Sequence, residues 1–265
     1  MEAKIFMFES KLSPNQKIKI SGFNNLTKVL SFNLYDFCIT LNEEQKGQYV
    51  NYINDKYNAT RIADISRKIV EIIEANILAV SAQDYDPVGA STMVLMSDIK
   101  GGGEPIPSAQ VSHHLDKSHI TAHTYPDAAD PDGICSFRVD FDIATCGEII
   151  PLNAINYLFE AFECDVVYVD YVVRGYTRLE NGKKIYNDHH FNSIQDFIKP
   201  EIKRNFTYMA DINMPQDNIW QTKMMVKEMG AENYLLNPHD VNHPDVPMKM
   251  ELLKKEMKEV YNMIH

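Results

Sequence analysis

Strict alternation of apolar and polar residues marks one stretch of this chain more clearly than any other. The stretch runs from Cys135 to Ala144, its apolar members are Phe137, Val139, Phe141 and Ile143, and its polar members are Ser136, Arg138, Asp140 and Asp142. Because successive side chains of a β-strand point to opposite sides, this period of two places the apolar residues against a core and leaves the polar residues on the other face. The stretch therefore predicts a half-buried strand in a sheet that is covered on one face.

The preceding segments predict neighbouring strands and their cover. Apolar residues recur at helical spacing over Glu43–Tyr57 and Arg61–Asn76, and these two ranges predict helices that pack on a sheet. Two β-prone runs, Ile77–Gln83 and Ala90–Ser97, flank the turn Asp86-Pro87-Val88-Gly89 and predict a hairpin.

The later segments add strands and helices. Strands are predicted over Ser118–Thr124 and Val166–Tyr176, and a helix over Pro151–Cys164, where proline suits the first helical position. Apolar residues at helical spacing predict two amphipathic helices, Asn218–Met229 and Met248–Ile264. The chain after residue 176 is therefore expected to be helical.

The sequence shows no boundary between domains. Lys100–Ser108 contains three consecutive glycines and two prolines, which predict a surface connection. The chain has no repeat, no low-complexity tract and no linker long enough to separate two cores. Residues 1–265 are therefore predicted to form a single α+β domain, a two-layer sandwich with a mostly antiparallel sheet covered by helices on one face, plus a helical C-terminal extension.

Charge and hydropathy argue against several classes of partner. Twenty-six basic and 37 acidic residues give a net charge of −11 with no concentrated basic patch, so neither nucleic acid nor an anionic membrane is an expected partner. The longest uninterrupted apolar runs are four residues, far below the roughly 20 that a membrane-spanning helix needs. Met1–Ser10 has one lysine and no apolar run long enough for export, which predicts a cytoplasmic protein.

Cysteines and histidines predict neither a disulfide framework nor a metal site. The cysteines show no CxxC spacing and are too sparse for a framework, so they are expected to be thiols, mostly small buried apolar groups. The pairs His113-His114 and His189-His190 lack the spacing of a helical metal site and are expected to be core or surface histidines. The four cysteines are Cys38, Cys135, Cys146 and Cys164.

Hydroxyl, imidazole and thiol groups are concentrated in two short segments, Asp116–Pro126 and Thr145-Cys146-Gly147. On the predicted strand Ser118 and His123 point to opposite faces, so they do not form a simple serine–histidine pair. The carbonyl carbon of Lys117 is nevertheless adjacent to the Ser118 hydroxyl, which suits a serine that attacks its own backbone. These residues fit either a self-processing site or a polar strand end.

Taken together, the motifs resemble the S-adenosylmethionine decarboxylase proenzymes of the longer bacterial type. A histidine five residues after a serine is a weak signal alone, but its order after a GAS segment and before a TCG segment is specific. The resemblance covers most of residues 20 to 200. The matching segments are Gly22–Lys28, Gln83–Ser91, Lys117–Pro126, Thr145–Gly147 and Asp170–Gly175.

The resemblance implies a cofactor made from the chain itself. Ser118 would attack the carbonyl of Lys117 and convert the amide into an ester, His123 would help to remove the serine α-proton, and Ser91 would orient the intermediate. Elimination and loss of ammonia would leave a pyruvoyl group at position 118. The implied products are a β chain of residues 1–117 and a pyruvoyl α chain of residues 118–265.

The same resemblance implies the reaction and its substrate. The pyruvoyl ketone would form a Schiff base with the α-amine of S-adenosylmethionine and accept the electrons released as CO2 departs. Cys146 matches the family's catalytic cysteine, the proton donor to the former α-carbon. The product would supply aminopropyl groups for the synthesis of spermidine and other polyamines.

Substrate contacts are implied at three residues. Tyr85, six residues before Ser91, matches an aromatic residue that stacks on adenine, and Phe23 is a candidate second wall or a core residue. Family members usually have glutamate four residues after the processing histidine to hold the ribose hydroxyls. Here Asp127 keeps the carboxylate with a shorter reach. The family forms dimers or tetramers, and some members of the longer type require Mg2+, for which the sequence indicates no site.

Two alternatives stay open at the level of the sequence. The same pyruvoyl chemistry could act on arginine or ornithine, and Asp127 is the reason to keep this reading. The chain could also be a non-catalytic homologue that stays unprocessed and regulates a partner, although intact Ser118, His123 and Cys146 argue against it.

Overall fold

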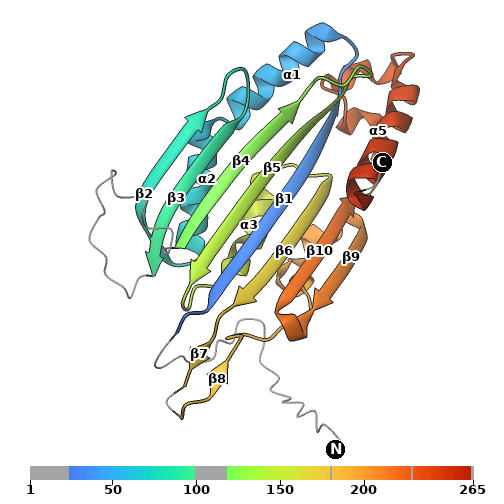
Figure 1. Cartoon of the computed structure of the whole chain (residues 1–265). Coiled ribbons are helices and arrows are strands. Elements are labelled where there is room, and N and C mark those ends of the chain that lie inside the picture. Colours follow the sequence, from blue (N-terminus) through green and yellow to red (C-terminus); the bar gives the residue numbers. More distant parts are fainter. Residues whose placement is uncertain (1–23, 99–117, 180, 228, 264–265) are drawn as a thin grey trace, which may run out of the picture.

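The structure, a computed structural model, describes residues 24–98, 118–179, 181–227 and 229–263. Expectations for Phe23, Lys100–Ser108, His113-His114 and Lys117 lie outside these residues. Eight of the described strands form one sheet in the order β2-β3-β4-β5-β1-β6-β10-β9, and every neighbouring pair is antiparallel (Figure 1). The strands are β1 (Thr27–Ile39), β2 (Ala75–Asp84), β3 (Ala90–Asp98), β4 (Ser118–Asp127), β5 (Ile134–Cys146), β6 (Val166–Arg174), β9 (Phe206–Met214) and β10 (Ile219–Val226), with β7 (Thr177–Arg178) and β8 (Lys184–Ile185) in a separate ribbon.

The strand β1 lies inside the sheet, between β5 and β6. It is not among the strands predicted from the sequence. It pairs with β5 along its whole length and with β6 from Thr27 to Tyr35. Leu30, Phe32 and Leu34 are fully buried, and the residues between them are half-buried. The period of two that marks β5 therefore also marks β1.

Three helices cover one face of the sheet and lie behind the strands in Figure 1. Asn42 and Asn58 each precede a helix, and the side-chain oxygen of each accepts a hydrogen bond from a backbone N–H three residues later, which satisfies an otherwise free donor. The ring of Phe159 meets that of Phe32 edge to face at 5.1 Å, so the third helix packs directly on β1. These helices are α1 (Glu43–Lys56), α2 (Ala59–Ile72) and α3 (Ile155–Ala161).

A further helix, α5 (Val246–Asn262), lies on the opposite face. It contacts β1, β5, β6 and β10, and the Tyr168 hydroxyl donates a hydrogen bond to the Val260 carbonyl. Tyr168 pairs with Asn33, whose side chain points away from α3, so α5 covers one end of the face that α1 to α3 leave free. We call this face the open face; its half-buried polar residues include Ser31, Asn33, Asp140, Asp142 and Asp170. The remaining α-helix, α4 (Pro200–Lys203), is a single turn.

The predicted fold class is confirmed, and one element is corrected. The helix predicted over Asn218–Met229 is wrong, because Ile219–Val226 form β10 between β6 and β9. Trp220, Thr222 and Met224 are buried at a period of two, as a strand requires. The expectation of a wholly helical C-terminal region is therefore also wrong, since two strands extend the sheet before α5. The other helices and strands that were predicted within the described residues are confirmed, with shifted ends.

Candidate active site

Ser118 and Cys146 lie side by side at one end of the sheet. Ser118 begins β4 and Cys146 ends β5, and these strands are antiparallel neighbours. The Cys146 backbone N–H donates a hydrogen bond of 3.0 Å to Ser118 Oγ. Ser118 is 5% exposed, so its hydroxyl is largely withheld from water, and the N–H that it accepts can stabilise negative charge on the oxygen. The structure thus brings the hydroxyl of the predicted serine next to the backbone of the predicted cysteine, and we call these two residues the Ser118–Cys146 pair.

Segments distant in the sequence surround this end of the sheet. Thr27 of β1 pairs with Cys146. The Asn25 N–H donates to the Tyr176 carbonyl at 3.1 Å, and Asn25 Oδ1 accepts from the Tyr176 N–H at 2.8 Å. Gly175, with φ of 82°, allows this approach because a Cβ there would lie 2.3 Å from the Asn25 carbonyl oxygen. Several of the segments that carry the resemblance therefore meet here.

A buried lysine that the sequence analysis does not single out stands beside the turn after β5. Lys28 is 0% exposed, and its Nζ donates to the carbonyl oxygens of Gly147 at 2.8 Å and Ile149 at 3.1 Å and to Asp188 Oδ2 at 2.5 Å. The Gly147 N–H in turn donates to the Leu26 carbonyl at 3.1 Å. The sequence could have indicated this residue, because Lys28 falls on the buried side of an alternating strand. A charge buried there needs a partner.

Ser91 and His123 form a second pair, on the open face. They are directly opposite in the register of β3 and β4, and such neighbours have Cβ atoms about 4.5–5.5 Å apart. The Ala90 N–H donates to Thr124 Oγ1 at 2.7 Å, a bond that fixes the start of β3 against β4. The structure thus places the two predicted processing residues together as the Ser91–His123 pair.

Tyr85 and Asp127 lie at the same end of the sheet as Ser91. Tyr85 is 42% exposed in the turn between β2 and β3, where its N–H donates to the Gly89 carbonyl at 2.8 Å. Asp127 is the exposed last residue of β4, and its Oδ1 accepts from the Ala129 N–H at 2.8 Å. Both predicted substrate contacts therefore have exposed side chains.

The two pairs are not brought together within one chain. Ser118 and His123 are five residues apart on β4, and a strand rises about 3.4 Å per residue, so their Cα atoms are about 17 Å apart. Alternation also turns them to opposite sides, since Ser118 shares the buried side with Ile120 while His123 is half-buried on the open face. The predicted divergence of these side chains is confirmed, and the two pairs, which we call half-sites, lie apart within one chain.

The other cysteines and the buried histidine belong to the packing. Burial raises the pKa of the Cys38, Cys135 and Cys164 thiols. His189 is fully buried, as expected for a core histidine, with Nδ1 2.7 Å from Asp188 Oδ1. Among the described residues, no group of three or more His, Cys, Asp or Glu side chains is placed to hold a metal ion. The described helices include none that is both long and apolar enough to cross a membrane.

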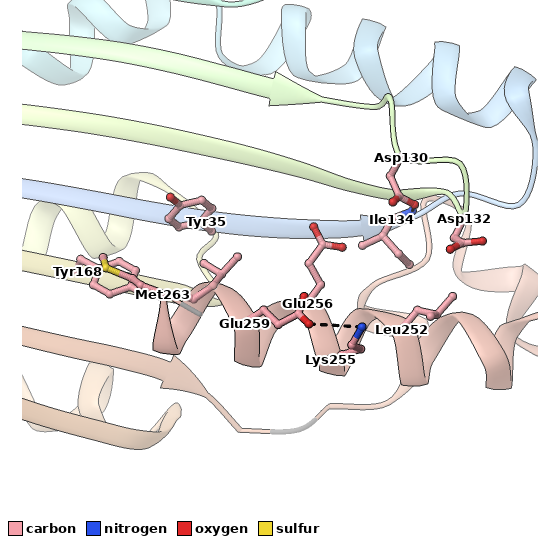
Figure 2. A pocket seen from close by; sticks show the side chains of 11 residues that line it. Tyr35, Asp130, Asp132, Ile134, Tyr168, Leu252, Lys255, Glu256, Glu259 and Met263 are labelled. Carbon is pink, nitrogen blue, oxygen red and sulfur yellow. Dashed lines mark hydrogen bonds and ion pairs between the residues drawn. The ribbon is translucent and has the colours of Figure 1, made fainter. Parts of the chain in front are cut away.

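A cavity of about 670 Å³ lies between α5 and the sheet (Figure 2). Burial, reinforced by the carboxylates of Asp130, Asp127 and Glu259, raises the pKa of Glu256 in its wall to about 7. Lys255 pairs with Glu259 at 3.4 Å. None of the predicted site residues lines this cavity, which opens near the start of β5 and not near its end at the Ser118–Cys146 pair.

Comparison with known proteins identifies close relatives. The family model described as S-adenosylmethionine decarboxylase matches residues 51–175. An S-adenosylmethionine decarboxylase proenzyme of Stenotrophomonas maltophilia (strain R551-3) is 47% identical over 258 residues, which is 95% of this chain and 97% of that protein. The proenzyme of Xanthomonas campestris pv. campestris (strain B100) is 46% identical over the same shares.

A solved structure is also similar. The crystal structure of the adenosylmethionine decarboxylase from Aquifex aeolicus VF5 matches 64% of this chain and 100% of its own, with a TM-score of 0.34 and 16% identity. The family assignment depends on the relatives, whose identity extends along nearly the whole chain. On that basis, this chain belongs to the S-adenosylmethionine decarboxylase family.

Proposed function

We propose that this chain is a self-processing, pyruvoyl-dependent S-adenosylmethionine decarboxylase, a carboxy-lyase that supplies polyamine biosynthesis. The observation that carries the proposal is the 3.0 Å hydrogen bond from the Cys146 N–H to Ser118 Oγ, which joins the residue that would be processed to the residue that would donate a proton. The relatives support the substrate, because they are named S-adenosylmethionine decarboxylase proenzymes. They give no support to arginine or ornithine as the substrate.

The surroundings of Ser118 fit self-processing. Attack of Oγ on the carbonyl carbon of Lys117 forms a C–O bond and breaks the C–N bond, so an ester and a free amine replace the amide. Removal of the Ser118 α-proton, for which His123 is the base, then breaks the Cβ–Oγ bond and releases the Lys117 carboxylate. Tautomerisation, addition of one water and loss of one ammonia leave a ketone at position 118. Ser91, paired with His123, would orient the ester.

Turnover assigns separate tasks to the remaining residues. The pyruvoyl group supplies an electron sink for decarboxylation. Cys146, half-buried at the end of β5, would deliver the proton to the α-carbon. The exposed ring of Tyr85 and the carboxylate of Asp127 would hold the nucleoside, with Phe23 as a second wall. The proposal includes activation by magnesium, for which no binding residue is named. It also includes a cytoplasmic location.

Two copies of the chain would complete each site. The half-sites are about 17 Å apart along β4, too far for His123 to reach the α-proton of Ser118 in its own chain. A two-fold axis lying across the strands, between two facing open faces, would reverse one sheet relative to the other and carry His123 of one copy over the start of β4 in its partner, on the side opposite the Ser118 side chain. Polar pairs on this face, such as the Ser31 hydroxyl of β1 donating to Asp142 Oδ1 of β5, suit a wet interface.

Intact-mass measurement on the purified, denatured protein tests the processing step. We expect two chains divided between Lys117 and Ser118, the second lighter by one ammonia than the product of simple hydrolysis. The Ser118→Ala variant should remain one chain, because it has no nucleophile. A wild-type chain that stays whole, or a Ser118→Ala chain that is cleaved at the same bond, would contradict the assignment. Release of CO2 from S-adenosylmethionine, compared with arginine and ornithine, then tests the substrate.

A further inference from the structure

We propose that Lys28 and Asp188 are positioning residues, which hold the turn after Cys146 in the arrangement that processing and turnover require. We call these two residues, with their supports His189 and Tyr171, the Lys28 clamp. The inference rests on the proposed function and extends it to side chains outside the predicted site residues. Residues 28 and 188 are 160 positions apart in the sequence, so folding alone brings them together.

The ammonium group of Lys28 is held by several acceptors. An ammonium has three N–H donors, and the acceptors of Nζ include the carbonyl oxygens of Gly147 and Ile149 and Asp188 Oδ2, at 2.8, 3.1 and 2.5 Å. The exposed fractions of the Lys28 and Asp188 side chains are 0% and 1%. Two of the acceptors lie within three residues after Cys146, so the buried charge of Lys28 holds this turn directly.

The carboxylate of Asp188 is itself held in one orientation. Its Oδ1 lies 2.7 Å from His189 Nδ1, and His189 Nε2 lies 3.2 Å from the Tyr171 hydroxyl. Burial raises the pKa of Asp188, but the hydrogen bond from His189 and the charge of Lys28 outweigh it and lower the pKa below its usual value. Burial, with the charge of Asp188, raises the pKa of Tyr171, which therefore stays a neutral hydroxyl. The ring of Tyr171 packs against Trp220 of the core at 6.0 Å.

Stability alone does not explain a buried ion pair here. Replacing such a pair with well-packed apolar residues is often neutral or stabilising, so a buried ion pair is weak evidence of a contribution to stability. An apolar pair would lose the hydrogen bonds that Lys28 donates to the carbonyl oxygens of Gly147 and Ile149. Gly147 directly follows Cys146, whose N–H donates to Ser118 Oγ at 3.0 Å. Because a misplacement of about 1 Å can lower a rate about 100-fold, loss of the Lys28 hydrogen bonds should affect both reactions at this end of the sheet.

The test replaces both charges together. Lys28→Met alone would leave the carboxylate of Asp188 buried and unpaired, and the variant could unfold for that reason. We therefore use the double variant Lys28→Met/Asp188→Asn in the full chain, and measure the processed fraction by intact mass, kcat and KM on the processed protein, and Tm. We expect Tm within about 5 °C of wild type. Processing should be slower, and kcat should fall at least about tenfold with KM little changed, because the clamp acts on the Cys146 turn and not on bound substrate.

A matched control and a second variant keep the test decisive. Lys249 is the other buried lysine among the described residues, and its Nζ donates to the Asp132 carbonyl near the start of β5. Lys249→Met should lower Tm and leave kcat and processing unchanged. If the double variant fails to fold, Lys28→Gln/Asp188→Asn, which also removes both charges, is measured in the same way. A folded variant with wild-type processing and kcat would overturn the inference, whereas failure of the wild-type chain to process would instead overturn the proposed function.

Discussion

Cys146 differs from the other three cysteines in its surroundings. Burial raises the pKa of the thiols of Cys38, Cys135 and Cys164, and a thiol kept protonated in apolar surroundings is unreactive. Cys146 instead ends β5, where its backbone N–H contacts Ser118 Oγ. The residue type alone could not make this distinction. In the proposed mechanism, its place beside the serine that would become the electron sink would suit Cys146 to donate a proton.

Replacing this thiol should separate processing from turnover. Cys146→Ala keeps the backbone N–H that contacts Ser118, so we expect the two chains to form as in wild type. Without the proton donor, kcat should fall about 100-fold or more. Intact mass and CO2 release measure the two effects on the same preparation. Cys164→Ala, which removes a half-buried thiol that packs on the core, is the control and should retain kcat. Undiminished turnover in Cys146→Ala would exclude its role as proton donor.

The periodicity of apolar residues predicts those helices and strands that local sequence determines, and it misses those that form only by pairing with remote strands. The strand β5 and the hairpin β2–β3 follow from alternation and from a turn rich in proline and glycine. Residues 219–226 place Trp220 and Met224 four positions apart, which suits a helix as well as a strand, and only the pairing with β6 and β9 decides between them. Asn218, with φ of 56°, marks the turn before β10. In the site, motifs predicted Ser118 and Cys146, whereas Lys28 was missed because its partner is remote in the sequence.

A buried carboxylate at the start of β6 should make stability depend on pH. Asp165 is 4% exposed, and its Oδ2 accepts from the Phe37 N–H of β1 at 2.9 Å. Burial raises its pKa to about 7 against the lowering effect of that hydrogen bond, and Glu163 adds to the rise. Asp36 titrates together with it, because burial and the charge of Asp165 raise the pKa of that carboxyl as well. A carboxyl group with a raised pKa in the folded state contributes stability below its unfolded pKa, near 4, and loses it as the pH rises through about 7.

The measurement is Tm between pH 4 and pH 8 for wild type and Asp165→Asn. The amide of asparagine can still accept from the Phe37 N–H, so the variant should keep the contact without the ionisation. We expect the wild-type Tm to fall by about 5 °C more than that of the variant between about pH 4 and pH 7. Glu71→Gln, at an exposed ion pair with Lys68, should follow the wild-type curve. Parallel curves for wild type and Asp165→Asn would refute the raised pKa.

The C-terminal extension covers part of the open face, so only the rest of this face would be free for the second copy that we propose. The family model ends at residue 175, and the chain beyond it adds β9 and β10 to the sheet and lays α5 over β1 and β6. The hydrogen bond from Tyr168 to the Val260 carbonyl ties α5 to the end of the sheet that is remote from Ser118. In the proposed dimer, a partner copy would therefore approach over the strands β3, β4 and β5, which carry the two pairs.

Mixing two inactive variants tests whether the half-sites meet between copies. Ser118→Ala keeps the Ser91–His123 pair, and His123→Ala keeps the Ser118–Cys146 pair, so neither should be cleaved alone. In a mixed dimer of two differently tagged variants, one of the two sites would hold both intact half-sites, and the His123→Ala chain in that dimer should be cleaved. Random pairing of equal amounts would cleave about half of the His123→Ala chains. Cleavage of the His123→Ala chain at the wild-type rate without the other variant would remove His123 from processing. Intact chains in mixed dimers isolated through both tags would exclude a shared site and require that Ser118 and His123 approach each other within one chain.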